Sequence, residues 1–407
     1  MYCGVIGLVY LAFSGYSTFA GRAPLTRSGG TIAGDYVAFY TAGRMLLDGD
    51  GARLYDPVRV REVEAETMQF LVPDLYDPFR NPPFFAVPFA PLALLDLMPS
   101  FVVWSMFNIA CLGYAIWLAL NMLPGLRAHW RAIGVIAFSF VPVYRGLVGG
   151  QNVGLSLLLY VLIYRAMCAG RVPAAGFWAA LGLFKPQLFL VFPIVFAASR
   201  RWRALATYCA VGVVLMIVSL AIVGVDGLWA WPRQILENEA GNALKNAYRM
   251  HSLKAFFDLL LPDQSGLGLA LYGAASAVLL VPLVRVWSLA NAWRDHLALR
   301  WALTSVIAVL LDPHLVDYDL VILVLTGLLI GATVRGGRWW LLGVYLALLG
   351  SLLFDVTLPF GGQLQPSVLV FVGFVAWSWY RLERLSVPAA VSVVTPLPRV
   401  RPEPGGD

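Results

Sequence analysis

The sequence predicts an all-α protein that crosses a membrane many times, and three observations support this fold class. Of 407 residues, 60% are hydrophobic and only 13% are charged, whereas a soluble domain carries about 25% charged residues. The mean hydropathy is +0.75, and the shortage of charge extends along the whole chain, as in polytopic membrane proteins. The 14 Trp and 17 Tyr residues are typical of aromatic belts at two membrane interfaces.

Apolar stretches near the ~20 residues that cross a bilayer recur along the chain. They lie at about 2–20, 98–122, 131–148, 152–169, 203–224, 266–288, 297–312, 315–332, 338–356 and 366–383. Two shorter runs, 173–184 and 186–199, flank Lys185-Pro186, and we expect two short helices that meet at the proline. Together these stretches predict a bundle of roughly 10–13 transmembrane helices.

Arginines gather in the segments that one topology places on the same side. They are Arg127, Arg131, Arg171, Arg200, Arg201, Arg203, Arg285, Arg294, Arg300, Arg335, Arg338, Arg381, Arg384, Arg399 and Arg401. If the N-terminus is cytoplasmic and the pair around Pro186 is a hairpin, all of them lie in the cytoplasm, as the positive-inside rule requires. Arg145 is the exception. The run at 2–20 lacks a basic n-region, which favours a retained helix over a cleaved signal peptide.

The same topology places two long segments, 21–83 and 225–263, on the outer face. The first contains two helical patterns, at about 35–48 and 57–70, with Pro57 at a favourable first-turn position. We expect these helices to lie on the membrane surface. The transmembrane domain covers 1–385, and the Pro-rich tail at 386–407 reads as disordered and cytoplasmic. The chain has only three lysines, Lys185, Lys245 and Lys254, and all fall on the outer face. This placement reflects either a specific function of these lysines or chance.

Asp35 is the first acid of the chain and lies near the outer end of the first span. Partial desolvation at the edge of a membrane cavity raises the pKa of a carboxylate, so that it can act as a general base. The alternative is structural: Asp35 precedes a helical pattern and can serve as its N-cap. The residues alone leave both roles open.

Several other polar residues fall on the outer face. Asn81, in Arg80-Asn81-Pro82-Pro83, either binds a sugar hydroxyl or forms a loop-to-helix junction. Gln151 and Asn152 follow Gly149-Gly150 and either bind hydroxyls or form a simple turn. A lysine between apolar half-helices is costly unless it pairs or faces water. Lys185 therefore either binds a phosphate or reaches to the interface.

The stretch Asp312–Asp319 combines three acids with His314 and Tyr318. Its Asp317-x-Asp319 pair is weak support for a metal, since neither a second histidine at metal spacing nor an HExxH motif occurs. We expect no metal and no cofactor, and assign His314 to a phosphate or sugar. The basic stretch Asn246–Lys254, with His251, either collects an anionic lipid headgroup or forms an interfacial helix.

Other function classes lack support. No P-loop, GxGxxG or GxSxG elbow occurs in a strand–turn–helix context, which argues against nucleotide hydrolysis and serine hydrolase chemistry. The net charge of +6 follows from cytoplasmic arginines, and no basic cluster interleaved with aromatics indicates nucleic-acid binding.

The order of the motifs resembles glycosyltransferase family 87, the polyprenyl-phosphate-mannose-dependent mannosyltransferases of the GT-C class. The resemblance covers residues 1–385. It rests on D-Y-x-x-F-Y-x-A-G-R-x-L-L-x-G from Asp35, L-Y-D-P from Leu54, N-P-P from Asn81, G-Q-N from Gly150, L-F-K-P-Q from Leu183 and P-H-x-x-D-Y-D from Pro313.

The resemblance implies an inverting transfer of a hexose, mannose by analogy, from a polyprenyl phosphate to a lipid or glycan hydroxyl. It implies a multi-pass enzyme with its active site on the extracytoplasmic face. We expect a bacterial-type plasma membrane, and the arginine distribution predicts that both termini lie in the cytoplasm. Asp35 matches the catalytic acid of the first outer loop, here a general base. Lys185 and His314 match positions around the donor phosphate, and we add His251 and Lys254. The sugar or acceptor set comprises Tyr36, Arg44, Asn81, Gln151, Asn152, Gln187 and Asp317.

Two other functions remain open. A transporter or flippase of lipid-linked sugars needs a similar polar cavity, but such proteins commonly show internal repeats and ionisable residues at the midplane. We find no convincing repeat, and the polar residues gather at one face. A non-catalytic subunit that binds lipid-linked glycans is the third reading.

Overall fold

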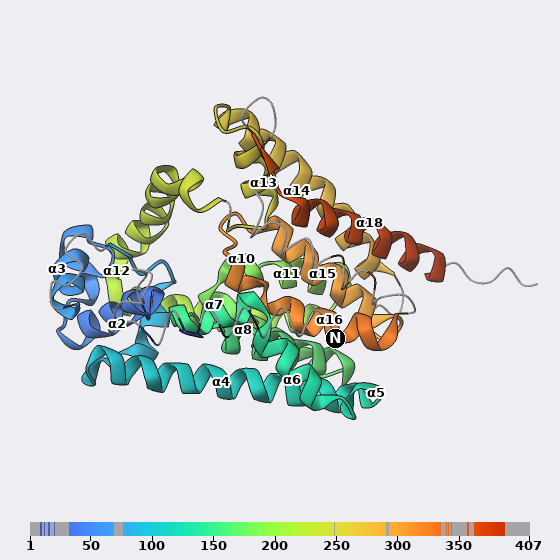
Figure 1. Ribbon diagram of the computed structural model, residues 1–407, viewed down its shortest axis with the longest axis horizontal. Coiled ribbons are helices and arrows are strands. Elements are labelled where there is room, and N and C mark those ends of the chain that lie inside the picture. The colour runs from blue at the N-terminus through green and yellow to red at the C-terminus, as the bar shows by residue number, and fades with distance from the viewer. Residues whose placement is uncertain are drawn as a thin grey trace, which may run out of the picture.

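The computed structural model describes residues 32–68, 76–247, 249–289, 293–334, 356–357 and 362–386, with single residues between 9 and 20 and between 339 and 343. Side chains at 238–246, 356–357 and 386 are not described. The expected spans at 2–20 and 338–356 and the tail beyond 386 therefore lie almost entirely outside the described residues, as do parts of the first outer segment. Within the described residues, the chain is an all-α membrane protein (Figure 1).

The N-terminal lobe, residues 32–94, contains short helices packed on one another. They are α2 (Gly34–Leu47), η1 (Gly51–Arg53), α3 (Pro57–Thr67), η2 (Pro83–Phe89) and η3 (Leu92–Leu94). The two helices expected in the first outer segment are thus confirmed. Pro57 occupies the first turn of α3, and the Asp56 carboxylate caps that helix by accepting from the backbone N–H of Val58 at 3.0 Å.

Helix α2 does not have the burial of a helix lying flat on a membrane. Its residues from Tyr36 to Gly43 are all buried, as is Met45. The rings of Phe39 and Phe89 stack at 4.9 Å between centroids, so η2 covers one side of α2. Since protein surrounds this helix, its apolar residues serve the core of the lobe, and the expectation of a surface helix is corrected here.

Three long helices carry the membrane-spanning character of the described residues. They are α4 (Leu97–Met122), α12 (Trp202–Ala247) and α14 (Ser265–Ser288), each long and apolar enough to cross a bilayer. The pair α6 (Trp130–Ser139) and α7 (Val141–Gly149) passes the same test as one span bent by 61°. Pro142 in the first turn of α7 accounts for the break, because a proline removes a helical hydrogen bond. Gly224 has φ 66° inside α12, where the helix kinks.

The remaining elements are shorter than these long helices. They are α5 (Pro124–Arg127), α8 (Val153–Cys168), α9 (Val172–Leu181), η4 (Gly182–Phe184), α10 (Pro186–Phe189), α11 (Val191–Ala198), α13 (Leu253–Leu260), α15 (Leu297–Leu311), η5 (Asp317–Ile322), α16 (Leu323–Thr333) and α18 (Pro366–Ser386). Strand β1 (Val356–Thr357) pairs antiparallel with β2 (Gln363–Leu364), Val356 opposite Leu364. The stretch expected to form one span at 315–332 consists of the 3₁₀ segment η5 followed by helix α16.

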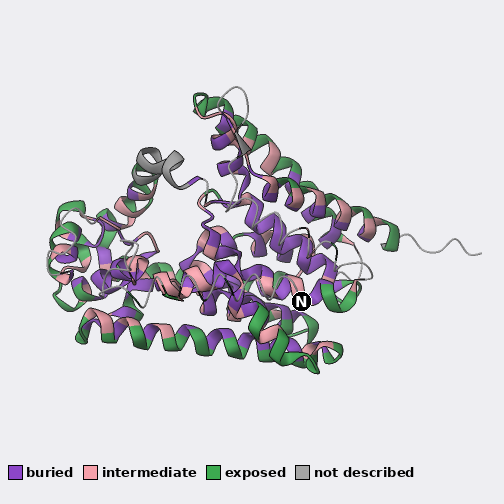
Figure 2. Ribbon diagram, in the orientation of Figure 1, coloured by how far each residue is buried: buried purple, intermediate pink, exposed green. Residues whose placement is uncertain are grey.

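Burial separates these elements into an inner and an outer set (Figure 2). In α15, every residue from Leu299 to Leu310 is buried. Only 17% of the most apolar stretch of α12 is buried inside the protein. An apolar helix that protein does not cover is typical of a surface that faces lipid.

Candidate active site

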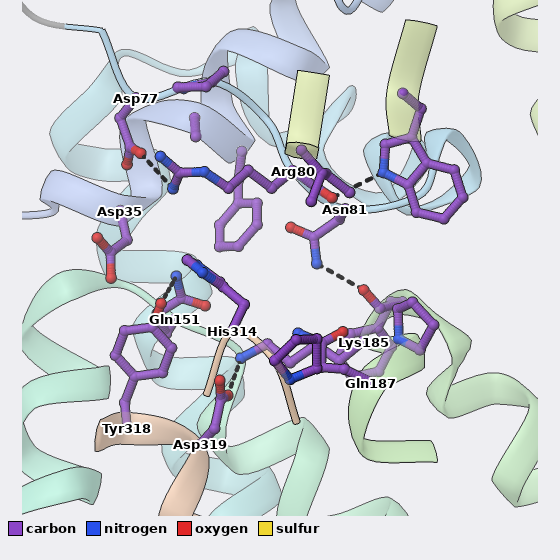
Figure 3. A pocket seen from close by; sticks show the side chains of 18 of the residues that line it. Asp35, Asp77, Arg80, Asn81, Gln151, Lys185, Gln187, His314, Tyr318 and Asp319 are labelled. Atoms are coloured by element: carbon purple, nitrogen blue, oxygen red, sulfur yellow. Dashed lines mark hydrogen bonds and ion pairs between the residues drawn. The ribbon is translucent and has the colours of Figure 1, made fainter. Parts of the chain in front are cut away.

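A cavity of about 340 Å³ lies where the N-terminal lobe meets α10, α12 and the segment before η5 (Figure 3). Six of the residues selected from the sequence line it: Asp35, Asn81, Gln151, Lys185, Gln187 and His314. They come from five separate stretches of the chain, which the fold brings to one place. The cavity is therefore the candidate active site.

The end of α7 holds Asp35 at the cavity. Asp35 lies in the first turn of α2, whose N-cap is Ala33 in a left-handed conformation, and no side chain caps this helix. The backbone N–H of Ala33 instead donates to the Val148 carbonyl at 3.2 Å. The N-cap reading of Asp35 is therefore wrong. Its carboxylate is directed by the docking of α2 on α7.

Two glycines at the end of α7 permit this docking. A Cβ atom on Gly149 would lie 3.1 Å from the Asp35 Oδ2 atom. Gly150 has φ +81°, and its added Cβ would lie 2.5 Å from the Cβ of Tyr36. The Gly150 carbonyl also accepts a 2.7 Å hydrogen bond from the indole of Trp104. The two glycines thus allow α2 to approach the end of α7 closely.

The surroundings of Asp35 favour its proton. The pKa of its carboxyl is raised from 3.8 to about 6, mainly by burial and to a smaller extent by the neighbouring Asp77 carboxylate. A hydrogen bond with Gln151 and the charges of Arg249 and Arg80 act in the opposite direction. A carboxylate with a pKa near neutrality accepts a proton more readily than an ordinary one.

Lys185 lies at the break between η4 and α10, as the proline after it led us to expect. Its backbone is non-helical, with φ −125° and ψ 73°. The Lys185 ammonium forms a buried ion pair with the Asp319 carboxylate and lies 4.9 Å from the centre of the Tyr318 ring. The hydroxyl of Tyr318 accepts a 3.3 Å hydrogen bond from Gln151. Lys185 is thus held in place by a countercharge and an aromatic ring.

The lip segment, residues 76–81, forms another wall of the cavity. The Arg80 guanidinium donates to the Asp77 carboxylate at 3.0 Å, and both side chains line the cavity. The Asn81 amide donates to the Phe184 carbonyl at 2.8 Å, which ties the lip segment to the residue before Lys185. In Figure 3, Asp77 and Arg80 lie across the opening from His314 and Lys185.

Three of the predicted residues lie away from this cavity. Tyr36 is fully buried, with its hydroxyl 2.6 Å from that of Ser100 and its ring against Phe101. Arg44 is exposed near the other end of α2 and pairs with Asp48 at 3.1 Å. Asn152 is buried below the turn after α7. We remove all three from the candidate site.

Three further predicted residues have other partners. Asp317 is buried and pairs with Arg145 and with Arg249, the latter at 3.3 Å. His251 is buried, with Nδ1 2.9 Å from the Ser367 hydroxyl, and burial lowers its pKa to about 4. Lys254 pairs with Asp258 one turn later on α13. None of Asp317, His251 and Lys254 lines the cavity, and we remove them too.

The cavity also contains polar residues that the sequence reasoning did not select: Asp77, Arg80, Tyr318 and Asp319. Arg80 directly precedes Asn81, and Asp319 belongs to the D-x-D pair, so both stood next to selected residues. Asp77 had no comparable signal. Among the described residues, no group of three His, Cys, Asp or Glu side chains is placed to hold a metal ion, and the expectation about metals stays a prediction.

Comparisons with known proteins point to one family. Residues 79–313 match glycosyltransferase family 87; this stretch includes Asn81, Gln151 and Lys185 but begins after Asp35. Over 191 residues the chain is 30% identical to a polyprenol-phosphate-mannose-dependent alpha-(1-2)-phosphatidylinositol pentamannoside mannosyltransferase of Mycolicibacterium smegmatis. That match covers 46% of this chain and 42% of the relative. The search of solved structures gives no match.

Proposed function

Because the chain belongs to glycosyltransferase family 87, we propose that it is a membrane glycosyltransferase with its active site in the cavity around Asp35. The observation that carries the proposal is the composition of this cavity. A carboxyl group with a raised pKa shares one space with Lys185, Arg80 and His314. A base opposite several groups that bind anions suits a transfer in which a phosphate leaves.

The proposed donor is a polyprenyl phosphate that carries a hexose. The relative from Mycolicibacterium smegmatis is by its name dependent on polyprenol-phosphate-mannose, which supports mannose as the sugar. That relative acts on phosphatidylinositol pentamannoside, and we assign this chain a lipid or glycan hydroxyl as its acceptor. The site faces the extracytoplasmic side of a bacterial-type plasma membrane in this proposal, and both termini lie in the cytoplasm.

The proposed chemistry is a single displacement. Asp35 takes the proton of the acceptor hydroxyl as the oxygen of that hydroxyl attacks the anomeric carbon. The bond from the anomeric carbon to the phosphate oxygen breaks, and the phosphate leaves with the electron pair. Attack from the opposite side inverts the anomeric carbon, so that the second carboxylate of a retaining mechanism has no role.

Lys185 and His314, together with Arg80, stabilise the phosphate charge that develops as the sugar departs. Asn81, Gln151 and Gln187 supply amides for sugar or acceptor hydroxyls. Lys185, which pairs with Asp319, reaches the phosphate in this proposal by turning its ammonium group away from that carboxylate.

The test is a transfer assay with purified full-length protein in lipid nanodiscs. The donor is a synthetic polyprenyl phosphate with a radiolabelled mannose, and a membrane lipid extract supplies acceptors. We expect Asp35→Asn to lower transfer about 10²- to 10⁴-fold, the usual contribution of a positioned base. The matched control is Asp48→Asn, at the other end of the same helix, where the side chain is 35% exposed; it should transfer at the wild-type rate.

Two results would reject the proposal. Asp35→Asn that transfers as fast as the control excludes Asp35 as the base. A wild-type protein that transfers no sugar but moves the labelled donor between the leaflets of a liposome is a flippase, not a transferase.

A further inference from the structure

The N-terminal lobe contains a buried carboxyl group that the proposed mechanism does not use. Glu64 lies on α3 with 0% of its surface exposed, although glutamate is rarely fully buried. Its Oε2 atom accepts a 3.2 Å hydrogen bond from the backbone N–H of Asp77. Glu64 therefore reaches from the interior of the lobe to the first polar residue of the lip segment.

The other end of the lip segment is held by different contacts. The Tyr55 hydroxyl donates to the Asn81 carbonyl at 2.7 Å, and the Trp231 indole donates to the Arg80 carbonyl at 2.9 Å. Between the two ends, the Phe79 ring packs against the Phe39 ring at 6.1 Å between centroids. None of these contacts involves Asp77. At its end of the lip segment the contacts come from α3: Glu64 binds the Asp77 backbone, and the Arg61 guanidinium lies 4.5 Å from the centre of the Tyr76 ring.

We propose that Glu64 is a positioning residue of the candidate active site, which fixes Asp77, and through it Arg80, opposite Asp35 by binding the backbone of the lip segment. The inference rests on the proposed function and deepens it. Asp77 and Arg80 both line the cavity. The Asp77 carboxylate raises the pKa of Asp35, and the Arg80 guanidinium lowers it. A shift of the Asp77 backbone therefore changes how strongly Asp35 holds a proton.

The proton on Glu64 matters for this role. Burial raises the pKa of its carboxyl from 4.5 to about 8, with a further contribution from the Asp77 carboxylate. The Asp77 N–H and the charges of Arg80 and Arg61 act against that increase. Near pH 7 Glu64 is neutral, so it accepts the Asp77 N–H without repelling the Asp77 carboxylate. Above about pH 8 it ionises, and two like charges then face each other inside the lobe.

The pH profile of transfer tests the positioning role. In Glu64→Ala the backbone N–H of Asp77 loses its hydrogen-bond acceptor, so that Asp77 and Arg80 move. A displacement of about 1 Å in an active site lowers kcat/KM about 10- to 100-fold. Its acid limb, which reports Asp35, should also move to lower pH as Asp77 leaves. Glu64→Gln keeps an uncharged acceptor, so it should transfer like the wild type at pH 7 and exceed it at pH 9. Glu66→Gln, an exposed glutamate on the same helix, is the matched control and should follow the wild type at both pH values.

An acid limb of Glu64→Ala at the wild-type position, with activity lowered equally at every pH, would overturn the proposal, because a purely structural role has that result. So would a Glu64→Gln variant that loses activity at pH 9 as the wild type does.

Thermal stability tests the inference without any sugar transfer. A carboxyl whose folded pKa is raised holds its proton longer in the folded state, so stability falls as pH rises from about 4.5 to about 8 and is level above. The Tm of the wild type should therefore fall relative to that of Glu64→Gln between pH 6 and 8. If the two Tm curves stay parallel, the inference on Glu64 is overturned. If the wild type instead transfers no sugar while its Tm still falls relative to that of Glu64→Gln between pH 6 and 8, a different conclusion follows. That result would reject the proposed function but would establish that Glu64 is protonated in the folded protein.

Discussion

At the scale of single residues, the charge of Asp35 is set by its neighbours. Burial is the main cause of its raised pKa, and Asp77 is the second. Because the proposed base must be ionised to accept a proton, transfer should rise with pH through about 6 and level off until Glu64 ionises above about pH 8. The acid limb of the wild-type profile thus reports the environment of one carboxyl group.

Removing the charge of Asp77 tests this account. In Asp77→Asn the repulsion of Asp35 disappears, and Arg80 no longer has a carboxylate partner in the lip segment, so both changes lower the pKa of Asp35. We expect the acid limb of kcat/KM to move below pH 6 and the plateau to fall several-fold, because a weaker base transfers the proton less readily. Asp263→Asn, an exposed position before α14, serves as the control. An unchanged acid limb in Asp77→Asn would contradict the electrostatic assignment.

The Lys185–Asp319 pair allows a second prediction at this scale. Both side chains are nearly buried, with 6% and 4% exposed, and removing one member of a buried ion pair costs about 3–5 kcal/mol. Asp319→Asn should therefore lower Tm, whereas Lys185→Met combined with Asp319→Asn should recover part of that loss. The double variant should still transfer poorly, since the proposed phosphate site loses one of its cations. Full recovery of transfer in the double variant would show that Lys185 has no role in catalysis.

The sequence could indicate which residue types the site needs, but not every partner that each one finds. Asp35, Lys185 and His314 were selected because unusual polar residues in an apolar chain require a reason, and they do share a cavity. Asp317 stands two residues from Asp319 and has the same chemistry, yet its carboxylate faces Arg145 and Arg249. Such a division depends on the direction of each side chain at a 3₁₀ turn, which hydropathy does not encode.

At the scale of elements, the ends of two long helices and the break before Pro186 follow from the sequence, whereas the tertiary contacts of α2 do not. The ends of α4 and α14 lie within one residue of the expected spans, 98–122 and 266–288, because length and apolarity are local properties. The burial of α2 was missed. Its covering segment η2 includes two prolines and follows the lip segment, so the contact is tertiary.

The docking of α2 on α7 yields a prediction at this scale. Gly150→Ala introduces a Cβ 2.5 Å from Tyr36 at a left-handed backbone, and the backbone strain alone costs about 1–2 kcal/mol. Gly49→Ala is the matched control, since Gly49 has φ +79° with nothing within 4 Å of the added atom. We expect Gly150→Ala to lower Tm more than Gly49→Ala and to reduce transfer, because Asp35 moves with α2. Equal effects of the two substitutions would show that the close approach to Tyr36 does not matter.

At the scale of the whole molecule, the arginine-rich turns meet at one end. The Arg201 guanidinium lies 5.0 Å from the Trp293 ring centre, whose indole donates to the Ser199 hydroxyl at 3.1 Å. Arg285 at the end of α14 pairs with Glu383 near the end of α18 at 3.0 Å. In Figure 1 the ends of α18 and α5 lie at the right, and α2 and α3 lie at the left. The positive-inside rule then predicts that the N-terminal lobe faces outward.

Thiol labelling in cells tests this orientation. In a variant without the four native cysteines, Glu62→Cys adds a thiol on α3, where the native side chain is 53% exposed, and Arg203→Cys adds one at the exposed start of α12. A reagent that does not cross membranes should label the first in intact cells and the second only after permeabilisation, because the positive-inside rule predicts that the arginine-rich end lies in the cytoplasm. The reverse pattern would place the cavity on the cytoplasmic side, and the proposed extracytoplasmic transfer would then be untenable.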